Sequence, residues 1–247
     1  MKRVAIIGGT GWASNAPQNT FTKREAETVS TRWGNANVFF CPMDDHEIIF
    51  IHRHVSPEST THLPPHRINY RANIAALKEL NVDLIFACSA VGCLRADWQS
   101  GSFALLDQII DFTSGRESTF HDDEAVHIDM TSPYDERGKV LLREAASQNN
   151  IDLYESAVYL CTNGPRFETA AEIRMFAQWG ADVVGMTGMP EVALARELQI
   201  PYAGIVVITN AAAGISQSPL THEEVQIEMQ CALPKLTSLI MDAAKIA

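Results

Sequence analysis

Short apolar runs alternate with amphipathic stretches along most of the chain. Runs of four to eight apolar residues bounded by turn residues are typical of buried strands, whereas apolar positions spaced by three or four residues indicate helices. The strands predicted in this way cover residues 3–7, 47–52, 83–88, 103–112, 157–161, 182–186 and 202–209. The predicted helices cover residues 66–80, 136–148, 168–179, 190–198 and 220–246, the last with a kink or break at Pro234.

This alternation of strands and helices predicts an α/β protein with a central mixed, mostly parallel sheet flanked by helices. The chain has 247 residues, of which 46% are hydrophobic, which suits a single domain over residues 1–247. In sheets of this kind ligands bind beyond the carboxyl ends of the strands. The residues that follow each predicted strand are therefore the candidates for function.

Charge and cysteine content narrow the function classes. The chain has 19 basic and 30 acidic residues and a net charge of -11, which argues against nucleic acid as a partner. Its five cysteines form no CxxC pair, as expected of reduced thiols rather than a disulfide framework or a structural zinc site. The first apolar run is too short for a signal peptide or a membrane span. We expect a cytoplasmic protein without a membrane partner.

The first predicted strand leads into Gly8-Gly9-Thr10-Gly11. Glycines allow a ligand to approach the backbone, and the threonine hydroxyl adds a donor, so the loop is a candidate phosphate site. A plain tight turn is the alternative. A dinucleotide fingerprint would need a third glycine, which is missing here, where Trp12 follows Gly11.

Three other strand ends carry groups suited to an anion. Arg53 and His54 follow the second predicted strand, and the guanidinium has a planar fork that matches phosphate oxygens. Ala90 lies in a stretch of small residues after the third strand. Thr187 places a hydroxyl just before a predicted helix. Taken singly, each could be an ordinary loop or turn residue.

Two further strand ends carry groups suited to an aromatic ring. Phe167 offers a stacking face, and Glu168 can accept a hydrogen bond from a ring N–H, although it could instead only stabilise a helix N-terminus. Asn210 follows the most apolar strand, where its amide can pair with a carbonyl beside a ring nitrogen or cap a turn.

The motifs together resemble the trimeric purine nucleoside phosphorylase and methylthioadenosine phosphorylase family over nearly the whole chain. Within the family the chain is most similar to the bacterial S-methyl-5′-thioinosine phosphorylases, through residues 111–117 and 210–214. The motifs that carry the resemblance are Gly8-Gly9-Thr10-Gly11, Arg53-His54, Asn69-Tyr70-Arg71-Ala72-Asn73, Asp107-Gln108 with Asp111, residues 164–169 and residues 185–191.

The resemblance implies a partly barrel-like sheet, a homotrimer, and a role for each matching residue. It places phosphate, a co-substrate, against Thr10, Arg53, His54, Ala90 and Thr187. It places Met186 under the ribose, and Phe167, Glu168, Asn210, Ala211 and Ala212 at the base. Asn210 and His54 would be the catalytic pair, with no metal and no cofactor.

The reaction that the resemblance implies is direct displacement of the purine by phosphate at an oxocarbenium-like ribosyl carbon. Relatives that cleave 6-aminopurines have Asp at the positions of Asn210 and Ala212. A 6-oxo group accepts hydrogen bonds and suits the Asn210 amide, whereas a 6-amino group needs a carboxylate. Glu168 suits the N1 hydrogen of a 6-oxopurine, and such polar matching can discriminate by about 10⁴.

The residues expected near the 5′ group of the nucleoside give two opposing indications of what that group is. His222 resembles the histidine that binds the ribose 5′-hydroxyl in purine nucleoside phosphorylases, where methylthio-specific relatives have an apolar residue. His127 instead resembles a residue that methylthio-type enzymes contribute from a neighbouring subunit. The overall likeness favours S-methyl-5′-thioinosine as the substrate, with inosine or guanosine as the alternative.

Two other function classes compete with this interpretation. A dehydrogenase would need the third glycine and an acidic residue at a strand end about 20 residues on, and Glu25 and Glu27 lie in a polar stretch instead. A nucleoside-binding module without catalysis would have no use for Arg53, His54 and Thr187 together.

Replacing Asn210 with aspartate should move activity from 6-oxopurine toward 6-aminopurine nucleosides, because the carboxylate accepts a hydrogen bond from the amino group. The measurement is kcat/KM for inosine-type and adenosine-type substrates on Asn210→Asp. If adenosine-type substrates gain nothing relative to inosine-type ones, the role assigned to Asn210 is wrong.

Overall fold

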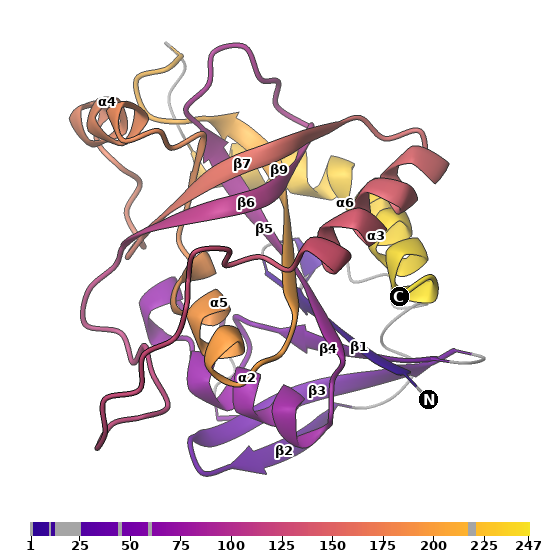
Figure 1. Ribbon diagram of the computed structural model, residues 1–247. Helices are drawn as coiled ribbons and strands as arrows, with labels where there is room; N and C mark the ends of the chain where they lie inside the picture. The colour runs from indigo at the N-terminus through magenta and orange to yellow at the C-terminus, as the bar shows by residue number, and fades with distance from the viewer. Residues whose placement is uncertain (1, 10, 13–25, 44–45, 59–60, 217–220) are drawn as a thin grey trace.

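The strands of this chain join into one mixed sheet with helices on both faces (Figure 1). The computed structural model describes residues 2–9, 11–12, 26–43, 46–58, 61–216 and 221–247. The strands there are β1 (Lys2–Gly8), β2 (Glu27–Thr31), β3 (Gly34–Pro42), β4 (His46–His52), β5 (Leu84–Cys93), β6 (Phe103–Phe112), β7 (Leu153–Thr162), β8 (Val183–Gly185) and β9 (Tyr202–Ala211). The helices are the 3₁₀ turn η1 (Pro65–Arg67) and the α-helices α2 (Tyr70–Glu79), α3 (Glu136–Gln148), α4 (Ala170–Gln178), α5 (Gly188–Glu197) and α6 (His222–Lys245).

The sheet has an open part and a closed part that share β5. Its strand order is β2-β3-β4-β1-β5-β8-β7-β6-β9, and β9 also pairs with β5, so that the last five strands close into a ring. Pairs β1–β4, β1–β5, β5–β9, β6–β7 and β7–β8 are parallel, whereas the edge hairpin β2–β3 and three other pairs are antiparallel. This arrangement confirms the predicted α/β class and its partly barrel-like sheet.

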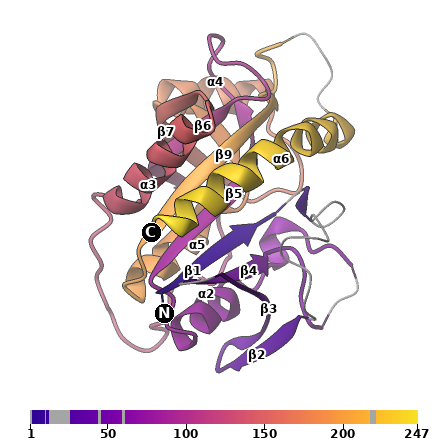
Figure 2. The ribbon, with the colours of Figure 1, turned by 90° about the vertical axis from the view of Figure 1, so that its right-hand side faces the viewer.

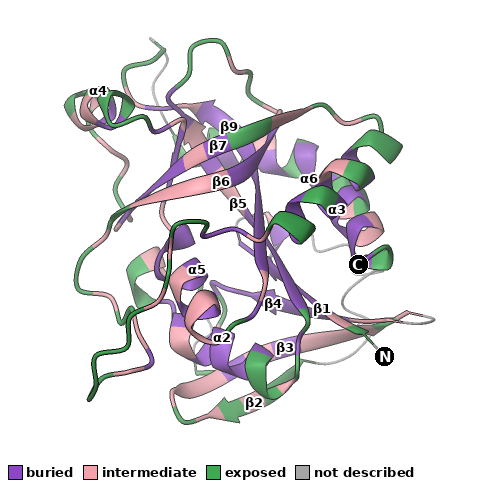
Figure 3. Cartoon of the chain, in the orientation of Figure 1, coloured by how far each residue is buried: buried purple, intermediate pink, exposed green. Residues whose placement is uncertain are grey.

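Alternating side chains of the strands fill two large cores on opposite faces of the sheet, and a third, smaller core packs α4 against β7 and β8. On β1, Ala5 and Ile7 belong to the core that includes residues of α2 and α5, and Val4 and Ile6 belong to the core covered by α3 and α6. Figure 2 shows α6 lying over β5 and β9, and Figure 3 shows the buried residues concentrated in the centre of the sheet. The buried sheet is a rigid platform for the loops at its strand ends.

The structure differs from the prediction in three places. The helix predicted at 66–80 is divided into η1 and α2, because the Asn69 side chain accepts a hydrogen bond from the Ala72 amide and starts a new helix there. Helix α6 runs unbroken through Pro234, which lies on its exposed side, where solvent can bind the carbonyl that loses its partner. The hairpin β2–β3 was not predicted, because β2 is polar and largely exposed and the apolar run of β3, at residues 38–41, is short and only partly buried.

In the described part of the chain, no helix is long and apolar enough to cross a membrane.

Candidate active site

A cavity of about 390 Å³ opens where the strand ends of the two parts of the sheet meet. Its walls come from the residues after β1, β4 and β7 and from the carboxyl ends of β5, β8 and β9. The cavity therefore lies where the strand order predicts a ligand site. The start of α6 and the loop at residues 62–65 form the rest of its wall.

Most of the residues predicted from the sequence line this cavity. They are Arg53, His54, Ala90, Phe167, Glu168, Met186, Thr187, Asn210, Ala212 and His222. Ala211 and His127 do not line it, and His127 lies on an exposed segment before α3. Thr10 lies outside the described residues, so its predicted role stays a prediction.

Arg53 is held by protein groups on most of its guanidinium. It is 2% exposed, and its Nε and Nη2 donate to the two carboxylate oxygens of Glu191 at 2.9 and 2.7 Å. Nη1 donates to the Cys88 carbonyl at 2.7 Å, and it lies 3.0 Å from where a Cβ on Gly9 would stand. The planar fork expected to meet phosphate thus binds Glu191, and Nη1 is the part of Arg53 nearest the glycine loop.

Glu191 keeps Arg53 charged inside the protein. Burial opposes the charge, but the Glu191 carboxylate and its hydrogen bonds raise the pKa of Arg53 above its usual value. Glu191 is fully buried at the first turn of α5 and also accepts a hydrogen bond from the Tyr202 hydroxyl at 2.8 Å. The network joins the end of β4, the start of α5 and the start of β9, and it fixes the anion-facing wall in place.

His54 is a neutral ring at physiological pH. Burial, with a smaller contribution from the charge of Arg53, lowers its pKa to about 3, although the hydrogen bond to the Leu63 carbonyl acts in the opposite direction. Its Nδ1 lies 2.8 Å from the Leu63 carbonyl, which can only accept, so Nδ1 has the hydrogen and Nε2 has a lone pair. The sequence suggested a donor here, but the neutral ring instead presents an acceptor, which can bind the P–OH of a protonated phosphate.

Two hydroxyls face each other between β5 and α5. The Ser89 and Thr187 hydroxyl oxygens are 3.1 Å apart, and Arg53 Nη1 is 3.4 Å from the Ser89 oxygen. Thr187 is the N-cap residue of α5, but its side chain makes no capping hydrogen bond, and the Ser89–Thr187 pair shares one hydrogen, which leaves the other O–H for a ligand. Hydroxyls beside a helix N-terminus and a guanidinium suit an anion with several oxygens.

Asn210 is oriented by its neighbours. The Thr209 hydroxyl lies 2.9 Å from Asn210 Oδ1 and 3.2 Å from the Val91 carbonyl, and Asn210 Nδ2 donates to the Ala211 carbonyl at 2.9 Å. Oδ1 and one amide hydrogen are therefore engaged, and within the described part of the chain the second amide hydrogen has no acceptor and is left to donate. Gly92 makes room for it, since a Cβ there would stand 3.2 Å from Nδ2.

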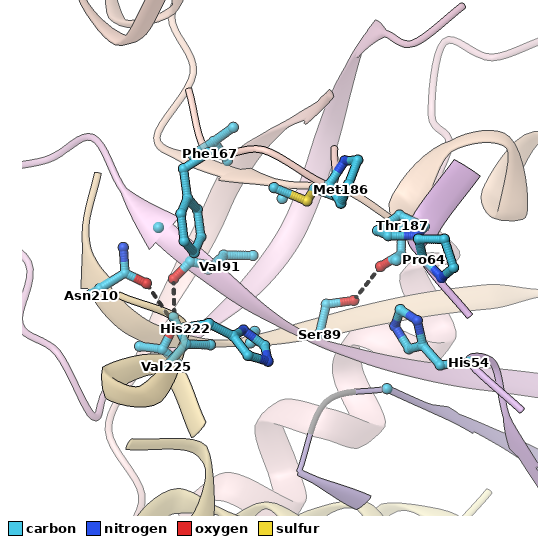
Figure 4. Close-up of a pocket in the computed structure, with 18 of the residues that line it drawn as sticks. His54, Pro64, Ser89, Val91, Phe167, Met186, Thr187, Asn210, His222 and Val225 are labelled. Atoms are coloured by element: carbon cyan, nitrogen blue, oxygen red, sulfur yellow. Dashed lines mark hydrogen bonds between the residues drawn. The ribbon is translucent and has the colours of Figure 1, made fainter. Parts of the chain in front are cut away.

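Phe167, Glu168 and Met186 complete this end of the cavity. Figure 4 shows Phe167 and Asn210 on one side, Ser89, Thr187 and His54 on the other, and Met186 between them. Burial raises the pKa of Glu168, and a hydrogen bond from the Thr162 hydroxyl opposes this rise. Gly164, with φ +60°, allows Met186 to approach, because a Cβ there would overlap with the Met186 sulfur.

The mouth of the cavity combines histidines with apolar groups. His222 is exposed at the start of α6, and Val225, one turn on, is buried and lines the cavity. The His62 ring stacks on His54 with centroids 4.4 Å apart, and burial, followed by the charge of His222, lowers the pKa of His62. The structure therefore leaves both a polar and an apolar group near the predicted 5′ side.

Arg116 and several other side chains that build the site were not predicted. Arg116 Nη2 donates to the carbonyls of Thr162, Asn163 and Met186 at 3.2, 3.0 and 2.9 Å, and Nη1 donates to the carbonyl of Met189. One guanidinium thus ties the ends of β7 and β8 to the first turn of α5. No spacing in the sequence indicates this role. His62, Thr162, Thr209 and Tyr202 were missed for the same reason.

The chain belongs to the phosphorylase superfamily, whose family model matches residues 3–245. This match confirms the family resemblance inferred from the motifs. The solved structure of methylthioadenosine phosphorylase from Schistosoma mansoni in complex with adenine superposes with a TM-score of 0.91. The two chains are 29% identical, and the match covers 100% of this chain and 91% of that one.

Relatives with both of the substrate names considered above are similar over nearly their whole length. The 6-oxopurine nucleoside phosphorylase of Pyrococcus furiosus is 45% identical, with 98% of this chain and 92% of the relative covered. The probable S-methyl-5′-thioinosine phosphorylase of Methanopyrus kandleri is 43% identical, with 97% and 91% covered. The two identities are nearly equal, so the chain is as similar to relatives of one substrate class as to those of the other.

Removing Glu191 should destabilise the protein strongly, because it leaves the buried Arg53 guanidinium and the Tyr202 hydroxyl without their acceptor. We expect Glu191→Ala to lower the free energy of unfolding by about 3–5 kcal/mol in urea denaturation. The control is Glu79→Ala on the exposed end of α2, with an expected change within about 0.5 kcal/mol. Equal changes in the two variants would contradict the role assigned to the ion pair.

Proposed function

We propose that this protein catalyses the reversible phosphorolysis of S-methyl-5′-thioinosine to hypoxanthine and 5-methylthioribose 1-phosphate. One observation carries the proposal: a donor amide and an acceptor carboxylate stand at one end of a cavity whose other end is built for an anion. Asn210 presents an N–H, and Glu168 presents a carboxylate held by Thr162. A 6-oxopurine offers the complementary pair, the O6 and N7 acceptors and the N1 hydrogen.

The site can perform the displacement with its own side chains. Phosphate at Ser89, Thr187 and His54 would attack C1′ as the C1′–N9 bond breaks, and the purine would leave with the bonding electrons. The free N–H of Asn210 would stabilise the negative charge that develops on the purine. Positioning of two bound reactants can contribute about 7–11 kcal/mol to such a reaction. Phosphate is a co-substrate, and the proposal includes no metal or cofactor.

The 5′ substituent and the assembly are also parts of this proposal. Val225 and Pro64 offer apolar surface to a methylthio group, which supports the leading substrate. His222 supports the alternative, a 6-oxopurine nucleoside phosphorylase acting on inosine or guanosine. A homotrimer in the cytoplasm agrees with the family resemblance, in which His127 serves a neighbouring subunit. His127 lies outside the cavity of its own chain, as that role requires.

Phosphate-dependent release of free base from S-methyl-5′-thioinosine, inosine and S-methyl-5′-thioadenosine, measured in parallel, tests the proposal. We expect the highest kcat/KM for S-methyl-5′-thioinosine. A preference for inosine would establish the alternative. Fast cleavage of S-methyl-5′-thioadenosine would overturn the roles of Asn210 and Glu168. If none of the three nucleosides is cleaved, the protein is a nucleoside-binding module without catalysis.

Replacing His222 with alanine should weaken the use of inosine more than that of S-methyl-5′-thioinosine, because only the 5′-hydroxyl can hydrogen-bond to the imidazole. The readout is the ratio of the two kcat/KM values, and the loss for inosine should be about 10-fold. Glu223→Ala, at the next position, which is also exposed, is the control. Equal losses for both substrates in His222→Ala would remove His222 from the 5′ site.

A further inference from the structure

The hydroxyl of Thr162 lies between two acceptors beside the base end of the cavity. Thr162 is the last residue of β7 and is 8% exposed. Its oxygen is 2.7 Å from Glu168 Oε1 and 3.4 Å from the Gly185 carbonyl. A hydroxyl has one hydrogen to donate, and the shorter contact has the length of a charge-assisted hydrogen bond to a carboxylate. The proton therefore points at Glu168.

We propose that Thr162 is a positioning residue that holds Glu168 as an acceptor toward the base and thereby sets the preference for purines with a hydrogen on N1. The inference rests on the proposed function, because it concerns the same cavity. Thr162 does not itself line that cavity, whereas Glu168 does. It acts on the base through the carboxylate.

The geometry leaves one carboxylate oxygen for the ligand. Thr162 occupies Oε1, and among the described residues no other side chain donates a hydrogen bond to Glu168. Glu168 itself stands in the loop before α4, whose capping box uses Thr169 and Glu172 instead. Among the described side chains, Thr162 is thus the one that orients the carboxylate, as Thr209 orients the Asn210 amide.

The Thr162 hydroxyl also influences the pKa of Glu168. Burial raises the pKa of Glu168, and the Thr162 hydrogen bond is the largest influence that lowers it, followed by a hydrogen bond from the Glu168 backbone. Of the two nearby charges, Glu172 raises this pKa and Arg166 lowers it. Arg166 and Glu172 are paired with each other, Nη2 to Oε1 at 2.7 Å and Nη1 to Oε2 at 2.9 Å, so their effects on Glu168 largely cancel. The Thr162 hydroxyl is then the main group that opposes the rise in the pKa of Glu168 caused by burial.

Loss of the hydroxyl should favour the protonated acid. A protonated Glu168 donates a hydrogen bond, which fits the N1 lone pair of a 6-aminopurine and opposes the N1 hydrogen of a 6-oxopurine. Because 6-oxopurine use requires the ionised form, it falls as the pH drops through the pKa of Glu168. Raising that pKa moves the acidic limb of the kcat/KM profile to higher pH.

The test compares Thr162→Val, which replaces the hydroxyl with a methyl group, with Thr162→Ser, which keeps it. The control is Thr237→Val on α6, away from the cavity. We measure kcat/KM against pH for S-methyl-5′-thioinosine and inosine, with S-methyl-5′-thioadenosine as the 6-amino probe. In Thr162→Val, kcat/KM for the 6-oxopurine nucleosides should fall about 10-fold at neutral pH, and the acidic limb of the profile should move to higher pH. The kcat/KM for the 6-amino probe should rise relative to that for the 6-oxopurine nucleosides. Thr162→Ser and Thr237→Val should keep the wild-type limb.

An acidic limb that stays at its wild-type pH in Thr162→Val, or an equal loss for 6-oxo and 6-amino substrates, would overturn the inference and leave Thr162 a packing role. Calorimetric titration with free hypoxanthine and adenine separates this outcome from failure of the proposed function, because binding needs no turnover. If the wild type binds hypoxanthine without phosphorolysis, the proposed function fails, and the inference stands or falls on whether Thr162→Val weakens hypoxanthine binding relative to adenine.

Discussion

The buried ion pair between Arg53 and Glu191 is the interaction on which the site depends. It joins residues 138 positions apart and connects the end of β4 to α5, while Tyr202 adds β9. A guanidinium without a partner at this depth would be strongly unfavourable, so the anion-facing wall exists only because α5 supplies a carboxylate. In an acidic protein the pair also holds one positive group rigidly beside the glycine loop.

Polar side chains in and directly behind the cavity wall hold the residues that face the ligand. Thr162 and Thr209 each contact both a backbone carbonyl and the side chain that faces the base. Arg116 ties three strand-end carbonyls together. These groups hold the side chains that contact the ligand within narrow limits before any ligand arrives, and this is the condition under which electrostatic complementarity is most effective.

The sequence predicted the apolar strands and the positions at their ends, because continuous apolar runs and the glycines after them are local properties. Phe167, Glu168, Thr187 and Asn210 were found in this way, and the structure brings them into one cavity. The hairpin β2–β3 was missed because β2 is polar and largely exposed and the apolar run of β3 is short and only partly buried. The partners of Arg53 and Glu168 were not predicted for another reason. In the sequence Glu191 is an ordinary acidic residue at a helix start and Thr162 an ordinary strand end, and only the fold places Glu191 beside Arg53 and Thr162 beside Glu168.

The strand shared by the open and closed parts of the sheet has a consequence for substrate range. Ser89 at the anion end and Gly92 beside Asn210 lie on the same stretch of β5, three residues or about 10 Å apart. The distance between phosphate and base is thus set by covalent bonds in a buried strand rather than by the closing of a loop. Substrate range can therefore diversify only at the rim, where new 5′ groups or new purine substituents meet replaceable side chains, while the length of the sugar between the two ends is invariant.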